Sequence, residues 1–220
     1  MRIAILGTGT VGRSLGTKLL ELGHDVGVGS RSTHNESAAT WLMTQTQRPD
    51  AAATTGTFAD VAGAAELIIN ATAGVASVGV VSSIDPELLA GKTLLDVANP
   101  LDFSNGFPPK LSVCNTDSLG EQIQRTLPQT HVVKGLNTVT AALMVDPTLI
   151  AGDHILPIAG NDDHAKGHVT ALLCEFGWRD SQIVDLGDIS AARVTEMYLP
   201  YWIRLMGVEG GPMFNIAVLR

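Results

Sequence analysis

The sequence predicts an α/β fold in which a doubly wound, mostly parallel sheet carries a small C-terminal α/β appendage. Short, continuously apolar segments alternate with helical patterns along most of the 220 residues, as they do in βαβ units whose sheet is covered on both faces. A glycine-rich turn pattern, G-x-G-x-x-G, follows the first apolar segment at residues 7–12. Apolar residues make up 45% of the chain, which is enough to bury a large core at this length.

Each element of the N-terminal part follows from a local pattern. Arg2–Leu6 is an apolar run that a glycine ends, and Leu15, Leu19 and Leu22 then recur on one face of a helix. Strands are expected next at 25–29, 67–71, 93–97 and 131–134. A short turn or helix is expected at 57–65, and a further helix around Leu119, Ile123 and Leu127. Strands separated by helices in this way are expected to lie parallel in one sheet.

The pattern changes after Met144, and we expect a boundary between a domain at 1–150 and a smaller one at 151–220. The C-terminal part contains an expected strand at 155–159, a helix over 165–176 that Gly177 closes, and a strand at 183–186. A long helical pattern over 191–202 contains Pro200, which predicts a kink or break there. Residues 214–219 are typical of a terminal strand.

Composition and charge exclude several classes of protein. The formal net charge is −8, and a negative field repels phosphate backbones, so nucleic-acid binding is not expected. No apolar run reaches about 18 residues, so no membrane span is expected, and the run after Arg2 is too short for a signal peptide. Cys114 and Cys174 stand far apart in no metal-ligand spacing. They predict buried thiols in a reducing cytoplasm and no metal site.

The glycine pattern predicts a dinucleotide-binding site in a Rossmann-type fold. It follows a predicted strand and opens a predicted helix, which is the context that this motif requires. Gly7 permits a sharp turn, Gly9 lets the backbone approach a pyrophosphate, and Gly12 lets the helix pack closely on the strand. The helix N-terminus offers N–H groups and the positive end of its dipole. The residues expected to hold the phosphates are Gly7, Thr8, Gly9, Thr10, Val11 and Gly12.

The end of the second predicted strand favours NADP over NAD. A site for NAD places Asp or Glu there to bind the ribose 2′-hydroxyl, but this chain has Ser30 and Arg31. A carboxylate would repel a 2′-phosphate, whereas a hydroxyl and a guanidinium bind it, the guanidinium with a bidentate fork. Thr8 can reach the same phosphate, and His34 can assist when it is protonated. The alternative is that Arg31 is a solvated loop charge.

Three loops are expected to border the nicotinamide, because ligands of parallel sheets lie beyond the carboxyl ends of the strands. These loops are 71–74, 99–101 and 137–138, and the residues expected to contact the cofactor are Thr72, Ala73, Asn99 and Pro100. Asn99 and Asn137 can position the carboxamide or a partner ring through amide hydrogen bonds. The structural alternatives are a simple turn at Asn99 and a helix N-cap at Asn137. Lys134 is expected to meet an anionic tail of a second cofactor or to be a surface lysine.

Several motifs in this order resemble the NADPH-dependent coenzyme F420 reductase family. The matching segments are 3–12, Gly29-Ser30-Arg31, 96–101 (DVANPL), 133–138 (VKGLNT), Asp185-x-Gly187, Ala192-Arg193 and Pro200-x-Trp202. The resemblance covers nearly the whole chain. It implies that an NADP-binding Rossmann domain joins a small C-terminal domain, which carries the second-substrate pocket and the dimer contacts. The cytosolic domain of STEAP-type metalloreductases is similar, and there a flavin takes the hydride.

The resemblance implies a cytoplasmic NADP(H)-dependent oxidoreductase that passes a hydride between NADP(H) and coenzyme F420, a deazaflavin. Such a transfer depends mainly on the placement of two rings, so Asn99 and Asn137 are expected to position rather than to exchange protons. The family also implies a homodimer joined through 214–219. The open alternatives are a flavin, quinone or ferric acceptor in place of F420, and a non-catalytic NADP redox sensor. The aromatic side chains over 197–202 are expected either to stack on a ring or to belong to the core or dimer interface.

Overall fold

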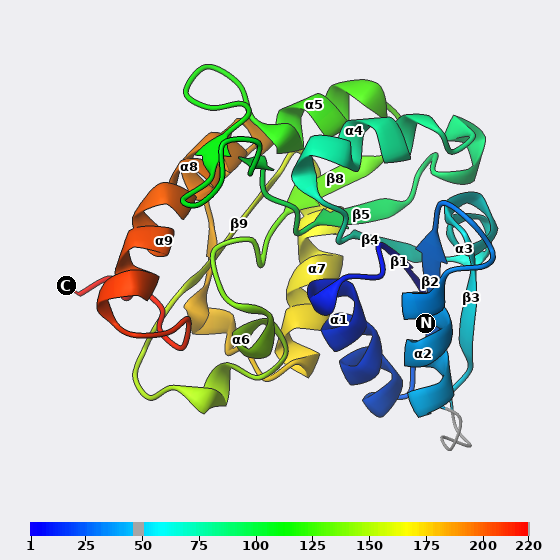
Figure 1. Ribbon diagram of the computed structural model, residues 1–220, viewed down its shortest axis with the longest axis horizontal. Coiled ribbons are helices and arrows are strands. Elements are labelled where there is room, and N and C mark those ends of the chain that lie inside the picture. The colour runs from blue at the N-terminus through cyan, green and yellow to red at the C-terminus, as the bar shows by residue number, and fades with distance from the viewer. Residues whose placement is uncertain (46–50, 220) are drawn as a thin grey trace.

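The computed structural model describes residues 1–45 and 51–219, and Figure 1 shows a central sheet with helices on both faces. The sheet has eight strands in the order β10-β9-β8-β5-β4-β1-β2-β3. They are β1 Arg2–Leu6, β2 Asp25–Ser30, β3 Ala53–Thr57, β4 Leu67–Asn70, β5 Thr93–Asp96, β8 His131–Lys134, β9 Leu156–Gly160 and β10 Ile183–Asp185. All neighbours run parallel except β8 and β9. The predicted fold class, a doubly wound and mostly parallel sheet, is confirmed.

Helices cover both faces of the sheet and divide the core in two. They are α1 Thr10–Glu21, α2 Glu36–Gln45, α3 Phe58–Ala64, α4 Gly74–Ser82, α5 Leu119–Thr126, α6 Ala141–Val145, α7 Asp163–Glu175, α8 Ala192–Met197 and α9 Leu199–Val208. Buried residues of α1, α2, α6 and α7 form one cluster with the sheet, and those of α3, α4, α5 and α8 form the other. Short 3₁₀ turns lie at Pro86–Leu88, Pro147–Leu149, Asp180–Gln182 and Ile189–Ala191, and a small hairpin pairs β6 Leu101–Asp102 with β7 Lys110–Leu111.

Residues after 150 extend the sheet of the N-terminal part. β9 pairs with β8 and β10 pairs with β9, so the sheet is continuous across residue 150. The boundary at 150 and the separate roles of its two sides stay predictions. The expected break at Pro200 is confirmed, because α8 ends at Met197 and Pro200 lies in the first turn of α9.

Two expectations about the C-terminal part and the cysteines are wrong. Residues 214–219 are not a strand: the Asn215 amide donates to the Ile155 carbonyl at 2.8 Å, and its oxygen accepts the Ile216 N–H at 2.8 Å. A side chain therefore takes the place of backbone pairing, and one backbone bond, from Ile155 N–H to the Ile216 carbonyl at 2.9 Å, joins the two segments. Cys114 and Cys174 are unpaired as expected, but both are exposed rather than buried.

A buried ionic cluster joins the sheet to the C-terminal helices. The Lys134 ammonium is fully buried and lies 2.8 Å from a carboxylate oxygen of Asp96 and 2.8 Å from one of Glu196. It also donates to the Ala98 carbonyl at 2.5 Å. Burial alone would lower the pKa of Lys134, but the two carboxylates raise it above its ordinary value, so the ammonium stays charged. The expectation that Lys134 meets an anionic tail or lies at the surface is therefore wrong.

Glu196 extends this cluster to the start of α5. Its two carboxylate oxygens accept the backbone N–H groups of Leu119 and Gly120, at 2.8 and 3.0 Å, in the first turn of that helix. Burial raises the pKa of Glu196, and the ammonium of Lys134 acts against that rise. Glu196 thus caps α5 from another helix, so α8, α5 and β8 are held together by one carboxylate.

Replacing Lys134 by methionine is expected to destabilise the protein strongly. Lys134→Met removes the cation but leaves two buried carboxylates, and breaking a buried ion pair in this way costs about 3–5 kcal/mol of unfolding free energy. Urea denaturation followed by circular dichroism measures the loss. The matched control is Lys110→Met, since Lys110 is exposed and pairs with Asp102 at 3.5 Å, so that variant is expected to change stability little. Equal losses in the two variants would contradict the buried role of Lys134.

Candidate functional site

The turn between β1 and α1 has the geometry that a dinucleotide site requires. Gly7 has a φ of +121°, and a Cβ there would lie 2.5 Å from the Ala71 carbonyl oxygen, so a side chain is excluded both by conformation and by space. A Cβ at Gly12 would collide with the Gly7 carbonyl. These contacts bring the start of α1 against the end of β1, as expected for the first and third glycines of the motif.

The N-terminus of α1 fits a pyrophosphate. Gly9 is the N-cap residue and supplies no side-chain cap, and the helix has no acidic residue in its first turn. No described atom lies within 4 Å of the position that a Cβ of Gly9 would take. The backbone N–H groups after Gly9 are therefore accessible to an anion, and the helix dipole favours one there. The roles expected for Thr8, Thr10 and Val11 stay predictions.

Ser30 is the last residue of β2 and Arg31 follows it, but the two side chains have different surroundings. The Ser30 hydroxyl is buried and donates to the Ser32 carbonyl at 2.5 Å, so it shapes the loop. Arg31 is exposed, and its guanidinium makes no ion pair or hydrogen bond with the residues that the structure describes. His34 is also exposed, next to Thr33 at 3.1 Å. Arg31 is therefore a cation without a partner among the described residues at the end of β2, and its binding of a 2′-phosphate stays a prediction.

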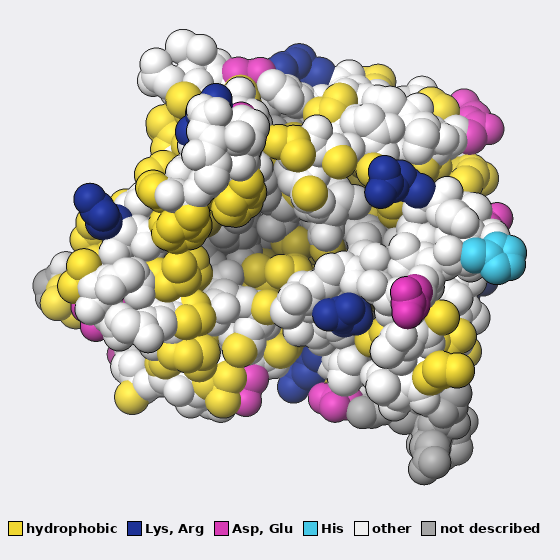
Figure 2. Space-filling view, in the orientation of Figure 1, with side chains coloured by type: hydrophobic (Ala, Val, Ile, Leu, Met, Phe, Trp, Pro, Cys, Tyr) yellow, Lys and Arg dark blue, Asp and Glu magenta, His cyan; other side chains and the backbone are white. Residues whose placement is uncertain are grey.

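A cleft of about 650 Å³ opens beyond the carboxyl ends of the central strands. The three loops expected to border the nicotinamide all line it, together with Val11 and α9 residues Leu199 and Trp202. Figure 2 shows a hollow in the middle of this face, with hydrophobic side chains gathered on the side of α9. Thr72, Ala73, Asn99 and Asn137 line the cleft as expected, whereas Pro100 is buried and does not line it.

Asn99 and Asn137 hold each other across the cleft floor. The Asn99 amide donates to the Asn137 backbone carbonyl at 2.8 Å, and the Asn137 amide donates to the Asn99 side-chain oxygen at 2.9 Å. Asn137 is not a helix N-cap, because Thr140 takes that position for α6. Leu136, directly before it, has a φ of +62°, a strained conformation for leucine. The pair is thus built into a constrained loop, which suits a positioning role.

A polar network behind the cleft was not expected from the sequence. The Asn70 oxygen accepts from the Thr72 hydroxyl at 2.7 Å, and the Asn70 amide donates to the Asp96 carboxylate at 2.8 Å. The Thr72 hydroxyl also lies 2.7 Å from the Ser77 hydroxyl on α4. These bonds fix the 71–74 loop to the end of the sheet. Sequence could have suggested the network, because polar residues end two neighbouring strands at Asn70 and Asp96.

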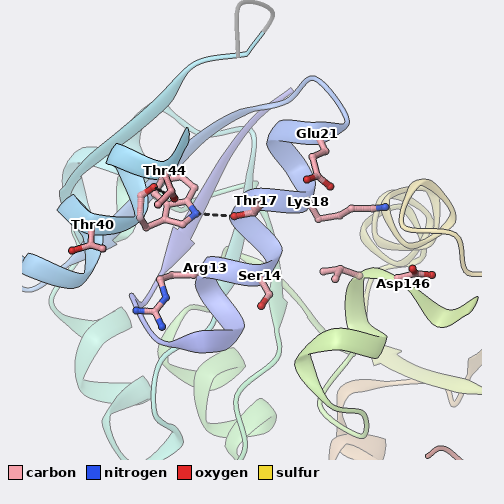
Figure 3. A pocket seen from close by; sticks show the side chains of 10 residues that line it. Arg13, Ser14, Thr17, Lys18, Glu21, Thr40, Thr44 and Asp146 are labelled. Atoms are coloured by element: carbon pink, nitrogen blue, oxygen red, sulfur yellow. Dashed lines mark hydrogen bonds between the residues drawn. The ribbon is translucent and has the colours of Figure 1, made fainter. Parts of the chain in front are cut away.

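A second cavity, of about 680 Å³, lies away from the strand ends. It runs along the outer side of α1 towards α2, where the Trp41 indole N–H donates to the Thr17 hydroxyl at 3.1 Å (Figure 3). Arg13, Lys18 and Asp146 also line it, but none of the residues expected in the site does. The cleft at the strand ends is therefore the candidate site.

Among the described residues, no helix is long and apolar enough to cross a bilayer.

Comparisons with known proteins agree with this geometry. A family model described as "NADP oxidoreductase coenzyme F420-dependent" matches residues 2–100. The crystal structure of a provisionally assigned F420-dependent NADP reductase from Arthrobacter sp. FB24 is 49% identical, has a TM-score of 0.92, and covers 100% of this chain and 100% of its own. Metalloreductase STEAP3 of Rattus norvegicus is 28% identical over 206 residues, which are 91% of this chain and 38% of that protein.

A more distant structure shows the fold alone. A reductive aminase from Aspergillus terreus, in complex with NADPH and ethyl levulinate, is 19% identical with a TM-score of 0.65. The match covers 95% of this chain and 62% of that chain. The identity is too low to transfer a substrate.

Substituting Gly74 is expected to damage the cleft without unfolding the protein. A Cβ at Gly74 would collide with the Asn99 carbonyl, so Gly74→Ala must push α4 away from the 99–101 loop. We expect NADPH affinity to fall about tenfold or more, measured by fluorescence titration. Gly79→Ala is the control. Gly79 lies on the same helix, and no described atom lies within 4 Å of the position that its Cβ would take. Alanine in place of glycine stabilises a helix by up to about 1 kcal/mol. Unchanged affinity in Gly74→Ala would contradict the assigned cleft.

Proposed function

The chain belongs to the family of coenzyme F420-dependent NADP oxidoreductases, and we propose on this basis that it transfers a hydride between NADP(H) and the deazaflavin F420. It is an NADP-dependent oxidoreductase by family. The observation that supports the proposal most is the cleft at the strand ends, which adjoins the glycine turn and has room for two flat rings. Whole-length similarity to an F420-dependent NADP reductase favours F420 as the second substrate.

The residues of this chain bind and orient, while the cofactor supplies the reactive hydride when it is bound. The α1 N-terminus would hold the pyrophosphate, and Arg31 the adenosine 2′-phosphate. Asn99 and Asn137 would orient the nicotinamide carboxamide or the partner ring, since their side chains already fix each other. Ala73 lines the cleft with a small side chain, and Gly74 lets the start of α4 lie directly against the Asn99 carbonyl.

A flavin, quinone or ferric acceptor is the second candidate. It is favoured by the similarity to STEAP3, a metalloreductase, although the chain spans only 38% of that protein. The remainder of that relative, outside the matched 38%, has no counterpart in this chain, so its name is weaker support for an acceptor than a whole-length similarity. F420 therefore remains the leading acceptor in this proposal.

We also propose that two copies of the chain form a homodimer, in the cytoplasm. Val194, Met197, Tyr201 and Val208 are exposed apolar residues on the consecutive helices α8 and α9. Four exposed apolar residues on two consecutive helices support an interface at α8 and α9. The two unpaired cysteines fit a reducing compartment.

Removing the Arg31 guanidinium is expected to weaken NADPH binding but not NADH binding. A hydrogen bond between charged groups contributes about 1.5–3 kcal/mol, so Arg31→Ala is expected to lower NADPH affinity about ten- to hundredfold. Titration of both cofactors by fluorescence measures the change in preference. Arg2→Ala is the control, because Arg2 begins β1, at the end of that strand away from the glycine turn, and pairs with Glu66. An unchanged preference in Arg31→Ala would exclude the phosphate contact.

An acceptor screen tests the second substrate. NADPH oxidation is followed with F420, FMN, FAD, quinones and ferric chelates in turn, and F420 is expected to give the highest kcat/KM. Turnover with flavin or ferric chelates and none with F420 would move the assignment to the second candidate. Tight NADPH binding without turnover of any acceptor would instead support a redox sensor.

A further inference from the structure

One wall of the cleft carries buried polar atoms that have no protein partner. The Asn137 side-chain oxygen, the Thr138 hydroxyl and the Trp202 indole nitrogen make no hydrogen bond with the part of the chain that the structure describes. All three residues line the cleft, and Asn137 and Thr138 are only 2% and 3% exposed. Unpaired buried polar groups are rare because each one costs stability. Three of them on one cleft indicate that a ligand supplies the partners.

The chemistry of these atoms restricts the ligand. The Trp202 nitrogen can only donate, the Asn137 oxygen can only accept, and the Thr138 hydroxyl can do both. A carboxylate or phosphate would leave the Asn137 oxygen unpaired, and an ammonium or iminium group would leave the Trp202 nitrogen unpaired. A group that carries both a carbonyl oxygen and an N–H satisfies all three, which leaves the carboxamide of the nicotinamide and a ring edge of this kind, and the binding test below distinguishes these two. The pyrimidinedione edge shared by flavins and deazaflavins is such an edge.

The charges around the cleft point to an uncharged group as well. Asp102 is the one charged side chain among the described residues that line it. A hydrogen bond from the Ser104 backbone N–H lowers the pKa of Asp102, so it is ionised at neutral pH. The exposed ammonium of Lys110 lies 3.5 Å from it and is engaged there. An anionic substituent therefore finds no free cation among the described residues of the lining and would remain outside.

Trp202 and Tyr198 differ in a way that supplies a control. The Trp202 ring is held against Phe214, with ring centres 5.4 Å apart and planes 27° apart, so its nitrogen has a fixed place on the wall. The Tyr198 hydroxyl is also buried without a partner among the described residues, but Tyr198 does not line the cleft. Each side chain has one buried polar atom without a hydrogen-bond partner among the described residues, which lowers stability, but only Trp202 lines the cleft.

We propose that Thr138 and Trp202 are specificity residues for the second substrate, and that they bind the uncharged pyrimidinedione edge of a flavin or deazaflavin ring while any anionic side chain stays outside. This inference rests on the proposed function, because it concerns the partner of NADP(H) in the same cleft. It assigns ring recognition to hydrogen bonds from neutral groups, with no contribution from an ion pair.

Equilibrium binding of the oxidised ring tests the proposal without turnover. Oxidised F420, riboflavin and FMN are each titrated against the protein saturated with NADP⁺, where no hydride can pass. Thr138→Val and Trp202→Phe are each expected to raise the Kd of the ring about tenfold and to leave the Kd of NADP⁺ unchanged. Their melting temperatures are expected to stay equal or rise, since an unpaired buried group is removed. Tyr198→Phe is expected to show the same thermal effect with no change in ring affinity.

The outcomes distinguish a failure of the ring-recognition inference from a failure of the proposed hydride transfer. A higher Kd for NADP⁺ with unchanged ring affinity would assign Thr138 and Trp202 to the nicotinamide and overturn the inference. FMN bound about tenfold more tightly than riboflavin, or none of the three rings bound, would overturn it as well. Ring binding that responds to both variants, combined with no NADPH oxidation by any acceptor, would support the inference while rejecting the proposed hydride transfer.

Discussion

The buried carboxylate of Asp96 is the group on which the arrangement of the site depends. Parallel register places Asn70, Asp96 and Lys134 in one row across the ends of β4, β5 and β8. Asp96 accepts hydrogen bonds from the other two side chains and from the Ala98 N–H, so three strand ends and the start of the 99–101 loop share one charge. A buried carboxylate is stable only while its donors are in place. The cleft geometry is therefore tied to the integrity of the sheet.

The sequence predicts the parts of the fold whose cause is local. The central strands β1, β4, β5 and β8 each contain adjacent apolar residues that are fully buried, as expected for strands of a sheet covered on both faces. β3 was not predicted, because Ala53–Thr57 is an edge strand of small and polar residues with little buried surface. α4 was not predicted either: Gly74–Ser82 is small and apolar around its circumference, so it shows no amphipathic stripe.

The same distinction explains the site. The three loops could be placed in advance, since every parallel strand delivers its following loop to the same edge. The burial of Lys134 could not, because it depends on Glu196, which lies far along the chain and reaches β8 only through the packing of α8. For Asn137 the sequence left two interpretations open, and its pairing with Asn99 depends on a tertiary contact between the loops that follow β5 and β8.

The two sides of the 135–138 segment differ in whether their polar groups have hydrogen-bond partners. On the sheet side the Lys134 ammonium is engaged by Asp96, Glu196 and the Ala98 carbonyl, and Leu136, two residues further on, has a φ of +62°, a conformation that leucine avoids. On the cleft side Asn137 and Thr138 keep polar atoms that the described protein leaves unpaired. A segment free to relax would turn these atoms towards a partner. The segment is anchored at Lys134 on one side and through the Asn99–Asn137 pair on the other, so the unpaired atoms stay on the cleft lining, where a ligand can supply their partners.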